Sequence, residues 1–517
     1  MMSRRLLIWL ALSASLAAAQ NTALDQGVEF IRDGHFEQAL PKLEEAHRLA
    51  PRNPMIENLL GITETKLGHI DEGNRHYRAA IALEGKQAAP HRNLGVNLLS
   101  SREYAAAASE LHEAARLDPK DPFVHFYLVL LALATGRDAD AIAQAPLAGR
   151  LIENDPATSA DLAEADIRTG RMDDASTIVT RLEQSGGISP QREYRIATQF
   201  AQHSSYSPAV GCFRHIASVD PSWQNRFNLA LALLYDNQPA EAASLLTALH
   251  SELPANADIL TFLGSAYETL EKIPQALEAY RAAATADPSS PDRMLDYTRL
   301  LMDSDHYDEA IQVIQSGLAA TDSQVPLQVR LGAIEMIKGN YPAARDAFHA
   351  ALAADPDLDA AYVGLAQTYA REANDAEALR ILESARADHP GHYLLEYYFG
   401  MLAGRLGREQ DAEAALNRAT QLQPTSIEPY FELGKLYEVK EDWTSARKAL
   451  ERVTGLNPQF APAHYQLSRV YAHLGLTSQA SEQAALTRSL VNQQRMEALR
   501  VQRARDGSFK SGQLAAP

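Results

Sequence analysis

Few residues of this chain stand at spacings that could do chemistry. The sequence contains no His-Glu-x-x-His metal motif, no Gly-x-Ser-x-Gly nucleophile motif and no glycine-rich phosphate loop. His389 and His392 are close enough to share a metal ion, but they flank Pro390-Gly391 and no further ligand stands nearby. We expect both to be solvated turn residues. The sequence therefore predicts no catalytic residue, no metal site and no cofactor.

The single cysteine and the paired carboxylates have structural explanations. Cys212 alone cannot form a disulfide within the chain or a zinc site made of thiolates. It stands beside Phe213 in an expected helix, which favours a buried small side chain over a nucleophile. Asp173 and Asp174 fall at an expected helix start, where carboxylates stabilise the helix dipole. An enzyme with an unfamiliar site is the less supported alternative.

The first nineteen residues predict a secretory signal peptide. Arg4 and Arg5 precede an apolar run over 6–16, and three alanines at 17–19 form a cleavage site before Gln20. An uncleaved anchor is the weaker alternative, because the run is about half of the ~20 residues that span a bilayer. We expect an exported chain, periplasmic or secreted, without an integral membrane span after cleavage. The paired arginines leave the general secretory and twin-arginine routes open.

The charge balance argues against a nucleic-acid partner. The chain has 48 basic and 66 acidic residues, and removal of Arg4 and Arg5 lowers the formal charge from −18 to −20. Nucleic-acid binding needs a concentrated basic face, and arginines gather only between 495 and 505. With 46% hydrophobic residues the chain is also too apolar to be disordered.

The main signal in the sequence is an internal repeat of 34 residues. Small residues recur at this interval in two series that stand twelve residues apart, with one step of 33, and the register gives fourteen copies. The two series include Gly27, Ala39, Gly61, Gly95, Ala107, Gly264, Ala276, Ala310, Gly332, Ala344, Ala378, Gly400, Ala412, Gly434, Ala446 and Ala480. Where two helices cross closely, only a side chain of methyl size or smaller lets the backbones approach. These positions therefore predict the packing contacts between paired helices.

Each copy also has the apolar pattern of two amphipathic helices. In one copy Leu260, Leu263 and Tyr267 share a face at helical spacing, and the second helix shows the same pattern. A stop such as Asp287-Pro288 follows the second helix, because proline cannot continue a helix but suits the next turn. The sequence therefore predicts helix-turn-helix units throughout.

These residues resemble the tetratricopeptide repeat family, whose pattern places bulky residues, Leu-Gly, Tyr, Ala and Pro at fixed offsets. The best single copy comprises Tyr430, Leu433, Gly434, Tyr437, Ala446, Leu450 and Pro458. The match covers Gln20 to about Asn492, and the copies over 123–223 depart most, with Val129 at a small position. The resemblance implies an all-α, right-handed superhelical solenoid of about fourteen helix-turn-helix repeats, with a concave groove lined by first helices.

The expected organisation has three parts. A signal peptide over 1–19 precedes a repeat array over 20–492, and 493–517 form the end of a capping helix and a flexible tail. The glycine-rich turn at 185–190 is a candidate hinge. Because repeats occupy nearly the whole chain, we expect no separate catalytic module.

The resemblance also places five positions of each copy on the groove. In the copies at 123–134 and 224–235 these positions are apolar, where a solvent-facing wall is ordinarily polar. The predicted groove residues are Phe123, Phe126, Leu130, Phe227, Leu231, Leu234, Tyr235, Tyr397, Met401, Phe431, Lys435, Tyr465 and Arg469. Aromatic rings with scattered cations suit an extended peptide or a partner helix. Burial within a tightly wound array, or cover by a homodimer, is an equally supported alternative.

We therefore expect an exported, non-catalytic scaffold that binds one or more protein or peptide partners in its groove. An accessory subunit of an envelope machine, for polysaccharide export or outer-membrane assembly, is the first alternative. Glycan binding by the groove aromatics is another. The fifth positions contain no lysine, so the use of this fold to grip a partner's terminal carboxylate is disfavoured.

Overall fold

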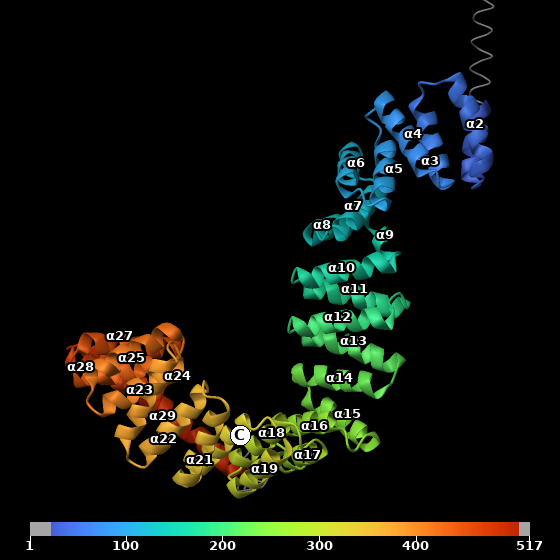
Figure 1. Cartoon of the computed structure of the whole chain (residues 1–517). Coiled ribbons are helices and arrows are strands. Elements are labelled where there is room, and N and C mark those ends of the chain that lie inside the picture. The colour runs from blue at the N-terminus through green and yellow to red at the C-terminus, as the bar shows by residue number, and fades with distance from the viewer. Residues whose placement is uncertain (1–21, 506–517) are drawn as a thin grey trace, which may run out of the picture. The chain divides into compact units, whose positions relative to one another are not determined.

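The computed structural model describes residues 22–505, and every regular element in this range is a helix. No strand occurs among these residues, so the prediction of an all-α helical repeat is confirmed. The chain divides into an N-terminal unit, up to Glu252, and a C-terminal unit, from Leu253. Within each unit the helices follow one another in chain order (Figure 1). In the described range no helix has both the length and the apolarity that crossing a bilayer requires.

Consecutive helix pairs build the N-terminal unit. The first helices of its pairs are residues 22–32, α3 (Pro54–Lys66), α5 (Ala88–Ser100), α7 (Pro122–Ala134), α10 (Pro156–Arg168), α12 (Pro190–Gln202) and α14 (Trp223–Tyr235). The second helices are α2 (Phe36–Leu49), α4 (Ile70–Leu83), α6 (Tyr104–Leu117), α8 (Asp138–Ala148), α11 (Met172–Ser185), α13 (Tyr206–Val219) and α15 (Pro239–Glu252). The one-turn helix α9 (Arg150–Glu153) follows α8.

The C-terminal unit repeats this arrangement. Its first helices are α16 (Ala257–Thr269), α18 (Pro291–Asp303), α20 (Val325–Lys338), α22 (Asp359–Arg371), α24 (Tyr393–Arg405), α26 (Glu428–Val439) and α28 (Ala461–His473). Its second helices are α17 (Ile273–Ala286), α19 (Tyr307–Ala320), α21 (Tyr341–Ala354), α23 (Asp375–Asp388), α25 (Glu409–Leu422), α27 (Trp443–Leu456) and α29 (Thr477–Arg505). Residues 22–505 thus contain fourteen helix pairs.

Proline and short polar residues set the helix boundaries. α6 ends directly before the stop signal Asp118-Pro119. Pro122 is the first residue of α7, where a missing N–H costs no helical hydrogen bond. The Asp121 side chain accepts a hydrogen bond from the Phe123 backbone N–H at 2.9 Å, which caps the helix.

The turn inside each helix pair has one residue in the left-handed backbone conformation, at the same position of all fourteen repeats. Seven are glycines: Gly34, Gly68, Gly136, Gly170, Gly339, Gly407 and Gly475. The other seven have φ between 55° and 63°: Arg102, Ser204, Asn237, Glu271, Asp305, Ala373 and Glu441. A Cβ in this conformation costs roughly 1–2 kcal/mol. The packing of the two helices therefore imposes the turn even where its residue disfavours it.

The predicted small residues lie where the helices of a pair cross. Fifteen of the sixteen named packing residues are buried, and Ala480 is half-buried because α29 is the last helix of the array. A Cβ on Gly434 would lie 2.7 Å from Leu450 Cδ2, and a Cβ on Gly264 would lie 2.8 Å from Tyr280 Cδ1. Each blocking side chain stands sixteen residues later, on the second helix of the same pair. A bulky residue of the second helix thus fills the space that the missing side chain leaves.

One second helix in the segment 123–223 is broken. α8 contains Pro146 and ends at Ala148, and Gly149 then takes a φ of 56° before α9 begins. The helix therefore has 11 residues, whereas the second helices α11 and α13 have 14. The sequence departures of this segment accompany a local break, and the helix pairs continue on both sides of it.

The structure describes the predicted boundary at 492/493 and the predicted hinge at 185–190. α29 continues without a break through the expected boundary at 492/493. The turn at 185–190 is closed, since the Gly187 N–H donates to the Leu182 carbonyl at 2.8 Å, and its role as a hinge stays a prediction. The predicted signal peptide at 1–19 and the tail beyond 505 lie outside the described residues.

Candidate binding groove

Apolar side chains on two first helices of the N-terminal unit are half-buried or exposed. All seven predicted groove residues of α7 and α14 keep contact with solvent: Phe123, Phe126, Leu130, Phe227, Leu231, Leu234 and Tyr235. Phe123 is 51% exposed and Tyr235 is 62% exposed. The rings also contact other aromatic residues, as Tyr206 and Tyr235 do in a stack with centroids 5.3 Å apart. Each helix thus presents an accessible apolar patch, which we name the α7 patch and the α14 patch.

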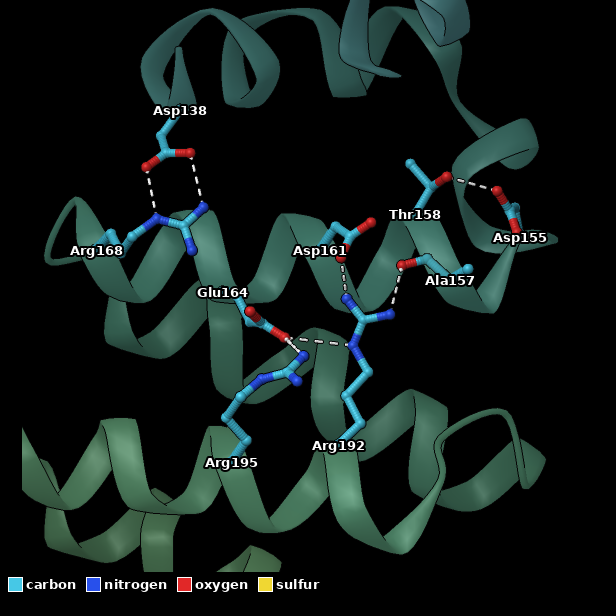
Figure 2. Close-up of polar contacts among 9 residues, drawn as sticks. All are labelled: Asp138, Asp155, Ala157, Thr158, Asp161, Glu164, Arg168, Arg192 and Arg195. Carbon is cyan, nitrogen blue, oxygen red and sulfur yellow. Dashed lines mark hydrogen bonds and ion pairs between the residues drawn. The ribbon is translucent and has the colours of Figure 1, made fainter. Parts of the chain in front are cut away.

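Figure 2 shows a charged stretch on α10 and α12. In chain order these two helices lie between α7 and α14. Glu164 accepts hydrogen bonds from Arg195 Nη2 at 2.6 Å and from Arg192 Nε at 3.3 Å. Arg192 also binds Asp161, and its Nη1 donates to the Ala157 carbonyl at 3.2 Å. These ion pairs join the first helices of adjacent repeats. The surface formed by α10 and α12 is therefore polar, and its charges are paired.

A bidentate ion pair continues the charged stretch toward α8. Arg168 on α10 donates to the two carboxylate oxygens of Asp138 at 2.7 and 2.8 Å, as Figure 2 shows. Hydrogen bonding from this guanidinium holds the pKa of the Asp138 carboxyl below its ordinary value. Asp138 is therefore charged at neutral pH, and the pair fixes the start of α8 against α10.

A cavity of about 340 Å³ opens between α3, α5 and α7. Asn97 Nδ2 donates to Thr65 Oγ1 at 2.9 Å, and both residues line the cavity. Arg92 Nη1 donates to Asp121 Oδ2 at 2.7 Å, while its guanidinium lies 5.9 Å from the Phe123 ring centroid. Amide, hydroxyl and aromatic groups are thus gathered beside the α7 patch, which suits the mixed polarity of a peptide.

The predicted groove residues of the C-terminal unit lie on α24, α26 and α28. They are Tyr397 and Met401 on α24, Phe431 and Lys435 on α26, and Tyr465 and Arg469 on α28. Tyr465 is 53% exposed. A cavity of about 230 Å³ is lined by Met401, Lys435 and neighbouring residues of α24, α25 and α26. Lys435 Nζ binds Glu432 at 2.6 Å and lies 5.3 Å from the Phe431 ring centroid, so this cation is already paired.

Two arginines on the first helices of the C-terminal unit, Arg330 and Arg371, have no ion pair among residues 22–505, and Arg330 is the more buried of the two. Arg299 donates to both carboxylate oxygens of Glu268 at 2.7 Å, and these hydrogen bonds lower the pKa of Glu268. Arg330 has no carboxylate at ion-pair distance among residues 22–505, and its Nη1 lies 3.7 Å from Met302 Sδ. Burial lowers the pKa of Arg330, and the charge of Arg299 adds to this effect. The Arg330 guanidinium is therefore a place where an acidic group would be stabilised.

His389, His392 and Cys212, the residues whose side chains could react or bind a metal, lie elsewhere in the structure. His389 Nδ1 is 3.5 Å from Asp357 Oδ1, whereas His392 pairs with Asp359. The two histidines therefore bind different carboxylates, in an inter-repeat turn. Cys212 is 3% exposed on α13.

Sequence reasoning missed the ion pairs that line α10 and α12. Their signal is a spacing: an acidic residue on one repeat is followed by a basic residue 30 or 31 positions later. This spacing joins Asp138 to Arg168, Asp161 to Arg192, Glu164 to Arg195, Glu268 to Arg299 and Asp375 to Arg405. A search for opposite charges at an offset just short of the repeat length would have found them.

Comparison with known families agrees with this architecture. One tetratricopeptide repeat model matches residues 58–122, 92–157, 227–291 and 431–488, and a second matches 269–331 and 335–403. The chain belongs to the tetratricopeptide repeat family. These matches leave uncovered residues 1–57, 158–226, 332–334, 404–430 and 489–517.

Two curated relatives come from bacteria. "Cellulose synthase operon protein C" of Pseudomonas fluorescens (strain SBW25) is 26% identical over 155 residues, covering 28% of this chain and 12% of that protein. "Cellulose synthase 2 operon protein C" of Komagataeibacter xylinus is 25% identical over 346 residues, covering 59% of this chain and 25% of that protein. The chain thus matches a quarter or less of the length of either relative.

Solved structures with similar helices include MamA, at 22% identity over 32% of this chain and 97% of that chain, with a TM-score of 0.30. The Cut9–Hcn1 complex of the APC/C matches 89% of this chain and 98% of that chain at 14% identity, with a TM-score of 0.35. Both TM-scores lie below 0.5, so these likenesses add nothing to the family assignment.

Proposed function

We propose that this chain is an exported, non-catalytic scaffold that binds a protein or peptide partner along its first helices. The observation that carries the proposal is the order of surfaces in the N-terminal unit, where the α7 and α14 patches stand on either side of the charged stretch on α10 and α12. Exposed aromatic rings bury a large area at low entropic cost and so supply the anchors of an interface. Paired charges between them set the register of the partner and disfavour wrong ones.

The partner that fits these surfaces is an extended segment or an amphipathic helix with two apolar anchors. Main-chain groups of such a segment find hydrogen-bonding side chains in the cavity beside the α7 patch. An acidic residue of a partner would find an unpaired cation at Arg330 in the C-terminal unit. A homo-oligomer, in which a second copy covers the patches, is the alternative that sedimentation of the purified chain tests.

The test is capture of partners by the chain and by a groove variant. Phe227→Ser with Leu231→Ser should weaken capture by more than about 100-fold, because each anchor of an interface contributes roughly 2 kcal/mol or more and 1.4 kcal/mol is tenfold. Leu147→Ser with Val219→Ser is the matched control, since it removes side chains that are 53% and 60% exposed on the second helices α8 and α13.

Helical circular dichroism should be the same for both double variants. Equal capture by the groove variant and the wild-type chain would contradict the proposal, as would equal losses in the groove variant and the control. A loss of helical signal confined to the groove variant would instead assign Phe227 and Leu231 to the core of the array.

An accessory role in an envelope machine is the second candidate, and the names of the two bacterial relatives favour it. Captured partners would then be subunits of a polysaccharide-export or outer-membrane assembly. Retention of glycan by the purified chain alone would instead favour the carbohydrate-binding alternative.

Export is the least direct part of the proposal and rests on residues 1–19. We expect the chain in the periplasmic or secreted fraction with Gln20 as its first residue. Cytoplasmic protein that keeps Met1 would contradict this part alone.

A further inference from the structure

Three metal-ligating side chains meet between consecutive helices of the N-terminal unit. Glu183 on α11, Glu193 on α12 and His215 on α13 each have one ligand atom within 4.8 Å of the other two. His215 Nδ1 lies 2.8 Å from Glu193 Oε1 and 2.9 Å from its Oε2. Glu193 is 1% exposed, so its carboxylate is shielded from solvent. A buried carboxylate requires a compensating positive charge or a proton.

We name Glu183, Glu193 and His215 the α11–α13 cluster. Cys212 stands one turn before His215 on α13 and is 3% exposed. A cavity of about 310 Å³ is lined by Glu183 and Cys212, together with hydroxyl groups of α11 and α13. A small ion therefore has a route to the cluster.

Another repeat has a buried glutamate, Glu57, at the position that Glu193 occupies in its own repeat. Glu57 stands four residues before the small residue of its first helix, as Glu193 does in its own repeat. The Glu57 carboxylate meets His47 at 3.1 Å and His76 at 2.7 Å. His47 comes ten residues before Glu57, on the second helix of the preceding repeat. A base thus compensates this buried carboxylate.

The C-terminal unit has the same arrangement with arginines. Glu396 stands at the same repeat position, and it meets Arg386 at 2.8 Å and Arg418 at 3.1 Å. Arg386 again comes ten residues before the buried glutamate. In the α11–α13 cluster this preceding position is Glu183, a second acid, instead of a base. The cluster therefore has one basic side chain against its buried glutamate, whereas the equivalent places have two.

A proton and a metal ion compete for the same carboxylate and imidazole lone pairs. Ligand atoms that already converge on one point are the geometry that favours the metal ion.

We propose that the α11–α13 cluster binds one divalent transition-metal ion of the zinc(II) class through Glu183, Glu193 and His215. Zinc takes nitrogen and oxygen ligands, and sites with three protein ligands keep a water molecule in the fourth position, whereas magnesium and calcium take oxygen ligands. The ion ties together α11, α12 and α13, within a segment that the family models leave uncovered. This site is independent of the groove.

The test begins with the full chain stripped of metal and titrated with ZnCl2 in a calorimeter. We expect one Zn²⁺ per chain. Titration with CoCl2 should give the intense visible bands of tetrahedral cobalt(II).

Variants distinguish this site from adventitious binding. Glu193→Gln and His215→Gln should each lower Zn²⁺ affinity more than about 100-fold, since loss of an outer-shell partner alone costs 10–100-fold. Cys212→Ser, which leaves the three ligands in place, should leave the titration unchanged. Glu57→Gln is the matched control at the same repeat position and should leave the titration unchanged.

All variants should keep the helical circular dichroism of the wild-type chain. The proposal is overturned if the metal-stripped chain takes up no Zn²⁺. It is equally overturned if Glu193→Gln and His215→Gln bind Zn²⁺ as tightly as wild type, or if Glu57→Gln loses the site.

Discussion

The ring of Phe348 is held between two glycines of successive repeats, and one added methyl group there tests the packing of the array. Phe348 on α21 is 2% exposed. A Cβ on Gly332 of α20 would lie 2.8 Å from ring atoms Cε1 and Cζ. A Cβ on Gly364 of α22 would overlap the same ring more deeply. The ring cannot turn away, because both of its neighbours are helix backbone in a close-packed core.

We predict that Gly364→Ala lowers the local free energy of unfolding by about 1 to 2 kcal/mol. Overpacking of a core costs roughly 1–3 kcal/mol. Replacing glycine by alanine inside a helix contributes about 0.5–1 kcal/mol in the opposite direction. Phe348→Leu removes the overlapping ring atoms, so the double variant should be more stable than the sum of the single changes by about 1 kcal/mol.

Amide hydrogen exchange in α20, α21 and α22 is the appropriate assay, because stability in a repeat array is local. Gly455→Ala on α27 is the control, since a Cβ at that position meets nothing within 4 Å. We expect it to leave protection unchanged or slightly higher. The packing argument fails if Gly364→Ala raises protection in α20–α22, or if the two single changes simply add.

Four further substitutions have defined outcomes. Ala373 and Gly407 both have positive φ, which favours glycine. Ala373→Gly should therefore stabilise its turn by about 0.5–1 kcal/mol, and Gly407→Ala should destabilise the equivalent turn by about 1 kcal/mol. The midpoint of thermal unfolding should shift in opposite directions for the two variants. Burial raises the pKa of Glu193 from 4.5 to about 7 in the metal-free chain. The contribution of Glu193 to stability is therefore complete below pH 4.5 and is lost as pH rises through 7. Glu193→Gln should therefore gain at most about 3 kcal/mol over wild type at pH 8 and little at pH 4.5, and urea unfolding that gives equal gains at both would contradict this. Arg330→Gln should weaken partner capture at low salt more than at high salt, and an unchanged salt dependence would remove Arg330 from the interface.

The fold was predictable from the sequence because its packing rule is local and periodic. Gly95 and Leu111, whose side chain fills the space beside it, stand sixteen residues apart. The same contact recurs at this offset from repeat to repeat. The left-handed turn residue was not predictable at Ala373 or Glu441, since neither favours that conformation. The helix pair imposes the geometry on them.

The candidate sites were less predictable, because they depend on which residues adjacent repeats bring together. The α7 and α14 patches followed from composition at known positions. The ion pairs of α10 and α12 join residues 31 apart, and their charges look scattered along the chain. The α11–α13 cluster is harder still to recognise. A single cysteine excluded an all-thiolate site, and nothing in the spacing of Glu183 and His215 suggests that one buried carboxylate joins them.

The central claim is that a partner binds the exposed side chains of the first helices. The most direct measurement places a photo-cross-linking amino acid at Leu231 and Tyr465 on first helices, and at Leu147 and Val219 on second helices, in cells that produce the chain. We predict adducts with a defined protein at the first-helix positions only. Adducts confined to the second-helix positions, or none at Leu231 and Tyr465, would contradict the account.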